Sequence, residues 1–206
     1  MTDDERGERR DAWDARHRER DIESGDPDPT FVAEVAKLAA GRALEVACGS
    51  GTNAVWLAQN GWRVTAVDWS AVALEKGRRR AAQVGVEIDW IEADLLAWQA
   101  PAGAFELVAA LYLHPLPNER HIIYSAIARA IAPGGHLLVI GHDRQNLGRG
   151  PGPPDPDRLF TAEDLGFELA TALPQLEIEE ARAVEHGPEP GQGPVDALLR
   201  MRRRPG

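Results

Sequence analysis

The sequence contains very little cysteine, and this scarcity limits the chemistry available to the protein. Among 206 residues there is one cysteine, Cys48, so the chain cannot form a disulfide within itself. A zinc site built from several cysteines is excluded for the same reason, and we expect no metal ion. A lone cysteine is typical of proteins kept in a reducing compartment, which predicts a cytoplasmic location.

Long hydrophobic runs and positive charge are also scarce. No apolar stretch approaches the roughly 18 residues needed to span a bilayer. Residues 1–21 are charged throughout and have no apolar segment of the kind a secretory signal requires. The 23 Lys and Arg residues are outnumbered by 33 Asp and Glu, giving a formal net charge of −10. A chain this acidic repels phosphate groups, so we expect neither nucleic acid nor a membrane as partner.

Hydrophobic residues make up 43% of the chain, enough for a core, and they recur in an alternation of strands and helices. Helices are predicted over Phe31–Ala40 with Thr30 as cap, Asn53–Gln59, Ser70–Val84 with Gly85 as stop, Asn118–Ile131 and Thr161–Leu169. Strands are predicted over Arg42–Ala47, Trp62–Val67, Val86–Glu92, Phe105–Leu111, His136–Ile140, Leu176–Val184 and Val195–Arg202.

This order of elements predicts a doubly wound, mostly parallel sheet with right-handed crossovers. The last two strands have no helix between them, so they must pair antiparallel through the loop His186–Gly193. Residues 1–30 are predicted to form a charged N-terminal segment, and residues 31–206 a single domain. Trp13 and His17 lie four residues apart, so they would share one face of an N-terminal helix.

The sharpest sequence feature is the glycine-rich segment Ala43–Asn53, which follows a predicted strand and precedes a predicted helix. Its glycines, Gly49 and Gly51, permit a sharp turn and a close approach of backbone to a ligand. With Ala54 they also match the dinucleotide fingerprint, whose third position accepts alanine. The segment alone is therefore compatible with a dinucleotide, with another nucleotide-containing cofactor, or with a tight turn that binds no ligand.

Three acidic residues near the carboxyl ends of successive strands narrow the choice of cofactor. Glu45 lies in a strand expected to be buried, where a carboxylate requires a partner such as an ammonium group. Asp68 ends the next strand, where it can accept hydrogen bonds from ribose hydroxyls. Asp94 ends the third and can accept from an adenine amino group. An α-ammonium beside Glu45 favours S-adenosylmethionine, whereas the pyrophosphate of a dinucleotide would be repelled there.

With these residues the sequence resembles the class I S-adenosylmethionine-dependent methyltransferases. The resemblance is carried by Leu44–Gly51, by Asp68, by Ala93-Asp94 and by Ile131–Val139. It implies a Rossmann-like, seven-stranded sheet with an antiparallel last strand. It also implies a set of cofactor-binding residues: Trp13, Glu45, Ala47, Gly49, Gly51, Asn53, Asp68, Trp69, Asp94, Leu95 and Leu111.

Three further segments are similar to the tellurite-resistance and thiopurine-type branch of that family. They are Trp13–Arg16, Gly51–Ala58 and Gly150–Pro154. In this branch the N-terminal tryptophan region helps to cover the cofactor. The sequence departs from the branch pattern at Thr52, where an arginine is usual, and at His17, where a tyrosine is usual.

The family chemistry is an in-line transfer that requires few catalytic side chains, because the cofactor carries the reactive group. The segment after the fourth predicted strand, Leu111–Pro117, lacks the Asn/Asp-Pro-Pro-aromatic turn of base-methylating enzymes. A small-molecule acceptor is therefore expected, with a thiol, oxygen, nitrogen or chalcogen atom receiving the methyl group. His114 is the candidate catalytic base, and Tyr112 is a candidate contact of the cofactor.

The glycine-rich loop Asp143–Asp157 is predicted to act as a mobile lid. Its Arg144 and Arg149 are candidate contacts of an anionic acceptor, and the adjacent His142 has the same status. Two other functions stay open at this point: a protein that binds S-adenosylmethionine without turnover, and a nicotinamide-dependent oxidoreductase. A monomer or a homodimer is expected.

Overall fold

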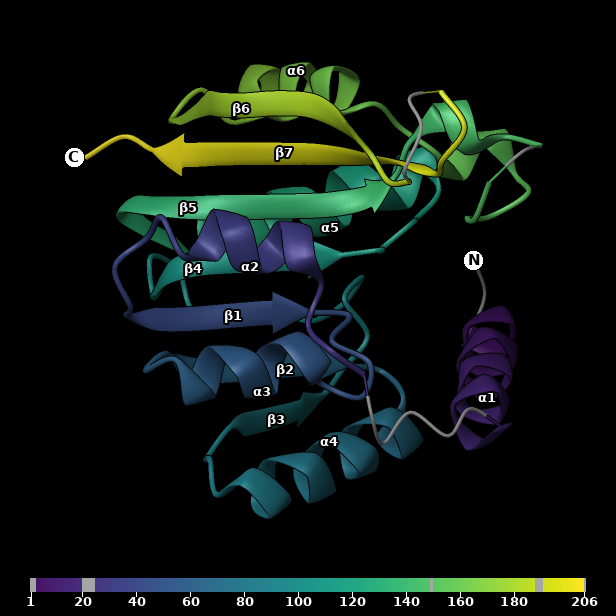
Figure 1. Cartoon of the computed structure of the whole chain (residues 1–206), viewed down its shortest axis with the longest axis vertical. Coiled ribbons are helices and arrows are strands. Elements are labelled where there is room, and N and C mark those ends of the chain that lie inside the picture. Colours follow the sequence, from purple (N-terminus) through teal and green to yellow (C-terminus); the bar gives the residue numbers. More distant parts are fainter. Residues whose placement is uncertain (1–2, 20–24, 149, 188–190, 206) are drawn as a thin grey trace. The chain divides into compact units, whose positions relative to one another are not determined.

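A computed structural model describes residues 3–19, 25–148, 150–187 and 191–205 (Figure 1). The chain divides into two compact units, residues 1–98 and residues 99–206. Within the described residues, no helix combines the length and the apolar character needed to cross a membrane.

The first unit alternates helices and parallel strands. Its elements are α1 (Asp3–Glu19), α2 (Pro29–Val35), β1 (Arg42–Val46), α3 (Thr52–Gln59), β2 (Arg63–Asp68), α4 (Ala71–Val84) and β3 (Asp89–Glu92). Strand β2 pairs in parallel with β1 on one side and with β3 on the other. The three strands therefore end at one edge, with Glu45 as the last residue but one of β1, Asp68 as the last of β2, and Asp94 two residues after β3.

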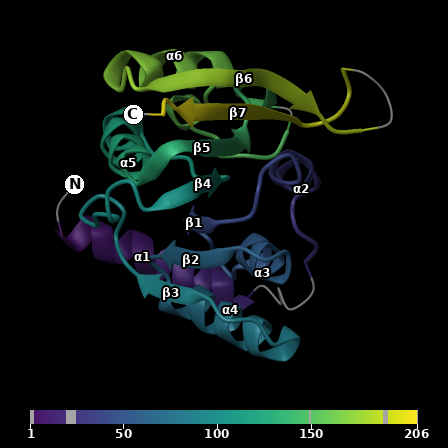
Figure 2. The same cartoon turned by 90° about the vertical axis from the view of Figure 1, so that its left-hand side faces the viewer.

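The second unit contains a parallel pair followed by an antiparallel hairpin (Figure 2). Its elements are β4 (Phe105–Leu111), α5 (Pro117–Arg129), β5 (Ile131–His142), η1 (Arg144–Asn146), η2 (Pro156–Arg158), α6 (Ala162–Ala172), β6 (Leu176–Glu185) and β7 (Val195–Arg203). Strand β5 pairs in parallel with β4, and β7 pairs antiparallel with both β5 and β6.

The strand order of the sheet is β3-β2-β1-β4-β5-β7-β6. This order confirms the predicted Rossmann-like, seven-stranded sheet, mostly parallel with an antiparallel last strand. The hairpin of β6 and β7 is confirmed as well. Strands β1, β4 and the second half of β5 are buried almost throughout, as expected for central strands covered on both faces.

Helix boundaries follow local capping chemistry. The predicted caps of α4 are confirmed: Ser70 Oγ accepts from the Ala73 amide at 3.1 Å, and Gly85 ends the helix with φ of +72°. The prediction for α2 was wrong by two residues at its start. Asp28, not Thr30, is the cap, accepting from the Phe31 amide at 2.8 Å, because Pro29 suits the first helical position.

The fifth strand was predicted to begin at His136, which left Pro133-Gly134-Gly135 outside it, and this was wrong. Strand β5 already begins at Ile131 and runs through this segment, with a register shift against β4. A Cβ on Gly135 would lie 2.9 Å from the Glu106 carbonyl oxygen, so only glycine permits this approach of the two strands. Helix α5 likewise starts one residue before Asn118, at Pro117.

Candidate functional site

The loop between β1 and α3, residues 47–51, is called the cofactor loop here. Its backbone enters the left-handed region at Ala47 (φ +52°), Gly49 (φ +54°) and Gly51 (φ +69°). Alanine is rare in this region, so Ala47 holds local strain of the kind that gathers at functional sites. Gly51 has a second reason to be glycine, because a Cβ there would lie 2.3 Å from the Trp90 ring.

Glu45 is the buried carboxylate that the sequence indicated. It is 2% exposed, and its Oε1 accepts from Asn53 Nδ2 at 3.3 Å. Its Oε2 is buried and has no hydrogen-bond partner among the described residues. Burial raises the pKa of Glu45 to about 8, and the hydrogen bonds from Asn53 and from the Ala54 backbone oppose the rise only in part. A cationic group is what this carboxylate requires, so the residues present fit the α-ammonium of S-adenosylmethionine.

Asp68 ties the end of β2 to the cofactor loop. Its Oδ2 accepts from the Gly49 amide at 2.8 Å, and its Oδ1 accepts from the Ser70 amide at 2.9 Å. Burial raises the pKa of Asp68, and these two hydrogen bonds oppose the rise. Each carboxylate oxygen keeps a further lone pair, so Asp68 can still accept from ribose hydroxyls.

Asp94 and Leu95 lie in the turn after β3. The Asp94 carboxylate accepts from the Leu96 amide at 2.9 Å and lies 3.6 Å from the Arg6 guanidinium of α1. The acid expected to meet an adenine amino group is therefore paired with a cation of the N-terminal helix. Leu95 is half-buried in the same turn.

Helix α1 packs over this edge of the first unit. Ser70 Oγ donates to Asp14, Lys76 Nζ donates to the His17 carbonyl, and Arg9 lies 5.9 Å from the Trp69 ring centre. A Cβ on Gly49 would lie 3.6 Å from the His17 ring. Trp13 is 40% exposed on the same helix, and its ring contacts are with Arg16 and His17. Sequence reasoning missed these anchors, since single polar pairs give no local pattern.

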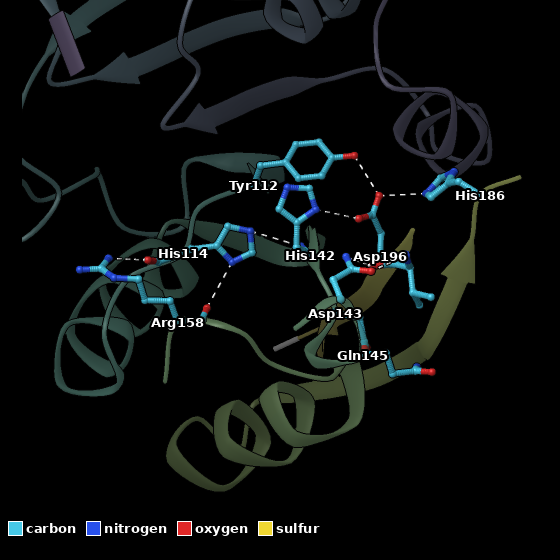
Figure 3. Close-up of polar contacts among 10 residues, drawn as sticks. Tyr112, His114, His142, Asp143, Gln145, Arg158, His186 and Asp196 are labelled. Carbon is cyan, nitrogen blue, oxygen red and sulfur yellow. Dashed lines mark hydrogen bonds and ion pairs between the residues drawn. The ribbon is translucent and has the colours of Figure 1, made fainter. Parts of the chain in front are cut away.

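His114 belongs to the second unit, and both its ring nitrogens are engaged by the backbone (Figure 3). The His142 amide donates to His114 Nε2 at 3.2 Å, so Nδ1 carries the proton that it shares with the Arg158 carbonyl, also at 3.2 Å. Burial, with the nearby His142, lowers the pKa of His114 to about 4. The ring is thus neutral and held in one tautomer.

Asp196, at the start of β7, was not a candidate and is the centre of a polar cluster. Its 5% exposed carboxylate receives the Tyr112 hydroxyl at 3.0 Å, and it lies 3.2 Å from His142 Nδ1 and 2.9 Å from His186 Nε2 (Figure 3). We call Tyr112, His114, His142, His186 and Asp196 the histidine–aspartate cluster.

The charge of Asp196 is set by these neighbours. Burial acts to raise its pKa, but hydrogen bonds from His142 and Tyr112 and the nearby His186 outweigh it, so the pKa is lowered. The carboxyl group is therefore ionised and can only accept. Leu111, the predicted cofactor contact before Tyr112, is buried as the last residue of β4. Tyr112 itself has φ of +53°, a second strained non-glycine residue after a strand.

Two backbone features position this cluster. In the antiparallel pair of β5 and β7, His142 is directly opposite Asp196, so their side chains share one face. Buried Asn146 then fixes the start of β7: its Nδ2 donates to the Val195 carbonyl at 2.7 Å, and its Oδ1 accepts from the Val195 amide at 2.8 Å. No local sequence pattern indicates the pairing of His142 with Asp196, because the two residues are 54 positions apart in the chain.

The loop Asp143–Asp157, the predicted lid, contains η1 and the start of η2. The structure describes contacts of two of its residues, Gly152 and Arg144. A Cβ on Gly152 would lie 3.0 Å from the His142 Cβ, so the Gly150–Pro154 segment packs against that histidine. Arg144 forms an exposed ion pair with Asp164 at 3.1 Å. Arg149 lies outside the described residues. Closure of the loop stays a prediction.

Known proteins share both the sequence of the central segment and the fold. Residues 43–135 match the family model described as a methyltransferase domain. A ubiquinone biosynthesis O-methyltransferase of Cronobacter sakazakii is 30% identical over 116 residues, covering 53% of this chain and 47% of that protein. The chain thus spans about half the length of the curated relatives it matches.

Two solved structures have the same fold at low sequence identity. A S-adenosylmethionine-dependent methyltransferase of Methanosarcina mazei aligns with a TM-score of 0.70 and 19% identity, covering 88% of this chain and all of that one. TehB of Haemophilus influenzae aligns with a TM-score of 0.68 and 16% identity, covering 89% and 64%. Residues 43–135 are thus similar to a methyltransferase domain, and the chain shares the fold of the two solved proteins.

Proposed function

We propose that this protein transfers the methyl group of S-adenosylmethionine to a small-molecule acceptor. The observation that carries the proposal is the buried carboxylate of Glu45, whose Oε2 has no partner among the described residues. An uncompensated buried carboxylate costs stability, and a bound ammonium group would offset that cost. The methyltransferase match over residues 43–135 supports the same cofactor.

The predicted residues of the first unit then have roles in holding the cofactor. Glu45 and Asn53 take the α-ammonium side, while Ala47, Gly49 and Gly51 let the backbone approach the ligand. Asp68 holds the ribose, Asp94 accepts from the adenine amino group, and Trp69 and Leu95 lie beside the adenine. Bound S-adenosylmethionine supplies an electrophilic methyl group on a sulfonium, and the protein orients the acceptor and excludes water.

We also propose that residues 1–30 cover the cofactor through α1, with Trp13 on the covering helix. The hydrogen bond from Ser70 to Asp14 and the pairing of Arg6 with Asp94 support this role, because both tie α1 to residues beside the predicted site. Membership in the tellurite-resistance and thiopurine-type branch is the finer proposal. Its support is the similarity of three segments to that branch: Trp13–Arg16, Gly51–Ala58 and Gly150–Pro154.

The test is calorimetric titration of the full chain with S-adenosylmethionine, its demethylated product and NAD, followed by a turnover screen. The acceptors are phenols, thiols, amines and the oxyanions of tellurium and selenium, with release of the demethylated cofactor as the readout. We expect binding of the first two ligands and turnover with one acceptor class. Binding without turnover across the panel would instead identify a non-catalytic binder, and selective NAD binding an oxidoreductase.

A further inference from the structure

Arg120, near the start of α5, is a buried cation to which the proposed function gives no role. Its side chain lies in a residue that is 7% exposed, although arginine is almost never buried unless an anion is paired with it. A guanidinium stays charged in proteins, so it cannot avoid the cost of burial by losing a proton. Glu45 of the first unit is the opposite case, because a buried carboxylate can be protonated. Arg120 therefore requires an anion more strictly than Glu45 requires a cation.

The contacts of Arg120 within the described part of the chain are with neutral groups. Its Nη2 donates to the Asp157 carbonyl at 2.8 Å, and its guanidinium carbon lies 5.4 Å from the centre of the Phe160 ring. Its Nε is buried and has no hydrogen-bond partner among the residues that the structure describes. One carbonyl and one aromatic ring thus leave most of the five N–H groups of the guanidinium without an acceptor.

The acidic side chains that are close to Arg120 along the chain, or in the segment that contacts it, have other partners. Glu119 Oε2 accepts from the Leu116 amide at 3.2 Å, and the Asp155 carboxylate lies 3.6 Å from Arg158 Nε. Within the described ranges, no carboxylate forms an ion pair with Arg120. Arg158 thus takes the acid of the neighbouring segment, and the charge of Arg120 is left unbalanced.

A second buried donor, the hydroxyl of Tyr124, lies on the same side of α5. Tyr124 follows Arg120 by four residues, which is about one helical turn. Tyr124 is fully buried, and its hydroxyl donates to the Leu113 carbonyl at 3.5 Å, a long distance for such a bond. Burial raises the pKa of Tyr124, and the charge of Arg120 opposes the rise, so the guanidinium acts on this hydroxyl. The two side chains can therefore donate to one anion together.

We propose that Arg120 and Tyr124 form a binding site for the carboxylate of a small molecule with an aromatic body. A carboxylate is planar and can accept from two N–H groups of one guanidinium. Its single negative charge balances the single charge of Arg120, whereas a phosphate dianion would need a second free cation. Phe160, which is 1% exposed and lies against the guanidinium, supplies an aromatic wall. All of these residues belong to the second unit, and the site does not depend on the cofactor.

The test is isothermal titration of the full chain, without S-adenosylmethionine, with benzoate, benzamide and inorganic phosphate. Benzamide is the neutral isostere of benzoate, so this pair isolates the contribution of the charge. We expect saturable binding of benzoate and none of benzamide or phosphate. Arg120→Met should weaken benzoate binding by at least about 10-fold, because hydrogen bonds to a charged group are lost. Tyr124→Phe should weaken it by several-fold, because one neutral hydrogen bond is lost.

Arg129→Met is the matched control, because it removes the same charge from an exposed position of the same helix. It should bind benzoate as wild type does. Urea unfolding of each variant separates binding from structure. Since a buried charge without an anion destabilises the folded state, Arg120→Met should be as stable as wild type or more stable. Benzoate should raise the thermal midpoint of wild type and leave that of Arg120→Met unchanged.

Failure of benzoate to bind the folded wild-type chain would overturn the site, and so would equal affinity for benzoate and benzamide. Tighter binding of phosphate than of benzoate would reject the carboxylate. Equal losses in Arg120→Met and Arg129→Met would show a general effect of charge instead of a site. A destabilised Arg120→Met, with benzoate binding intact in Tyr124→Phe, would make Arg120 a structural residue. The titration with S-adenosylmethionine tests the proposed function separately.

Discussion

The cofactor loop of the first unit and the histidine–aspartate cluster of the second are built in opposite ways. The cofactor loop is local: Glu45, Gly49 and Gly51 lie within seven residues of one another, and the helix α3 follows at once. The cluster is non-local, since Tyr112, His142 and Asp196 come from three strands and meet through an antiparallel register. A site whose residues lie close together in the sequence can be predicted from their spacing. A site whose residues meet through strand pairing cannot.

The two regions share one feature that neither spacing nor composition indicated. Each places a strained non-glycine residue directly after a central strand, Ala47 after β1 and Tyr112 after β4, with φ of +52° and +53°. Such conformations persist only where the surrounding structure holds them. In the first region Asp68 accepts from the amide of Gly49, two residues after Ala47, and in the second the Tyr112 amide donates to the Ile140 carbonyl and its hydroxyl to Asp196.

The largest effect on stability is expected at Glu45, because the buried carboxyl group proposed to bind the cofactor also destabilises the folded state. The unfolded carboxyl ionises near its ordinary pKa of 4.5, and the folded one near 8. Between these values the folded state keeps a proton that the unfolded state has lost, so the free energy of unfolding falls as pH rises. Glu45→Gln should remove this slope and raise the free energy of unfolding by about 2–4 kcal/mol at pH 8, while cofactor affinity drops.

Chemical denaturation between pH 4 and pH 9, with calorimetric titration of S-adenosylmethionine, measures both sides of this prediction. Glu34→Gln is the matched control, because Glu34 is as buried as Glu45 but forms a 2.7 Å ion pair with Lys37. It should gain no stability. A Glu45→Gln protein that is less stable at pH 8, or that binds the cofactor as well as wild type, would contradict the role given to this carboxylate.

An intermediate effect is expected at Asp68. Asp68→Ala removes the acceptor of the Gly49 and Ser70 amides together with the proposed ribose contacts. It should cost about 1–3 kcal/mol of cofactor affinity, because a buried hydrogen-bonding group is lost from both loop and ligand. Isothermal titration measures the loss. Asp89→Ala, at the exposed opposite end of β3, is the control and should bind normally; equal affinity of the two variants would show that Asp68 does not hold the ribose.

The smallest of the three effects is expected in the second region, at Asn146. Asn146→Ala removes both hydrogen bonds to Val195, the residue before Asp196, and should lower the free energy of unfolding by about 1–2 kcal/mol. Cofactor affinity should stay constant, because the loss is confined to the pairing of β5 with β7 in the second unit. Asn60→Ala, an exposed side chain that donates to the Trp56 carbonyl, is the control. A parallel loss of cofactor affinity would show that the two regions are not separable.

The fold predictions that were wrong concern where α2 and β5 begin. Asp28 replaced Thr30 as the cap of α2, and it is also tied to Asn53, 25 residues away, through its own amide. Pro133-Gly134-Gly135 reads as a turn in isolation, yet β5 pairs with β4 on either side of it, at Ile131 and at His136, and runs through it. At β5 a tertiary contact outweighed a local preference, whereas at α2 the deciding factor, the suitability of Pro29 for the first helical position, is itself local.

By itself the sequence determined the alternation of strands and helices, the antiparallel hairpin at the end of the chain, and the cofactor loop with Glu45 and Asp68. These features depend on periodicity, capping and short spacing, which act between residues close along the chain. The tertiary structure alone decided that His114 is held neutral by backbone groups, that α1 is tied to Ser70 and Asp94, and that Asp196 meets His142. Those contacts depend on the register of strands and the packing of distant segments, for which one sequence carries no local signal.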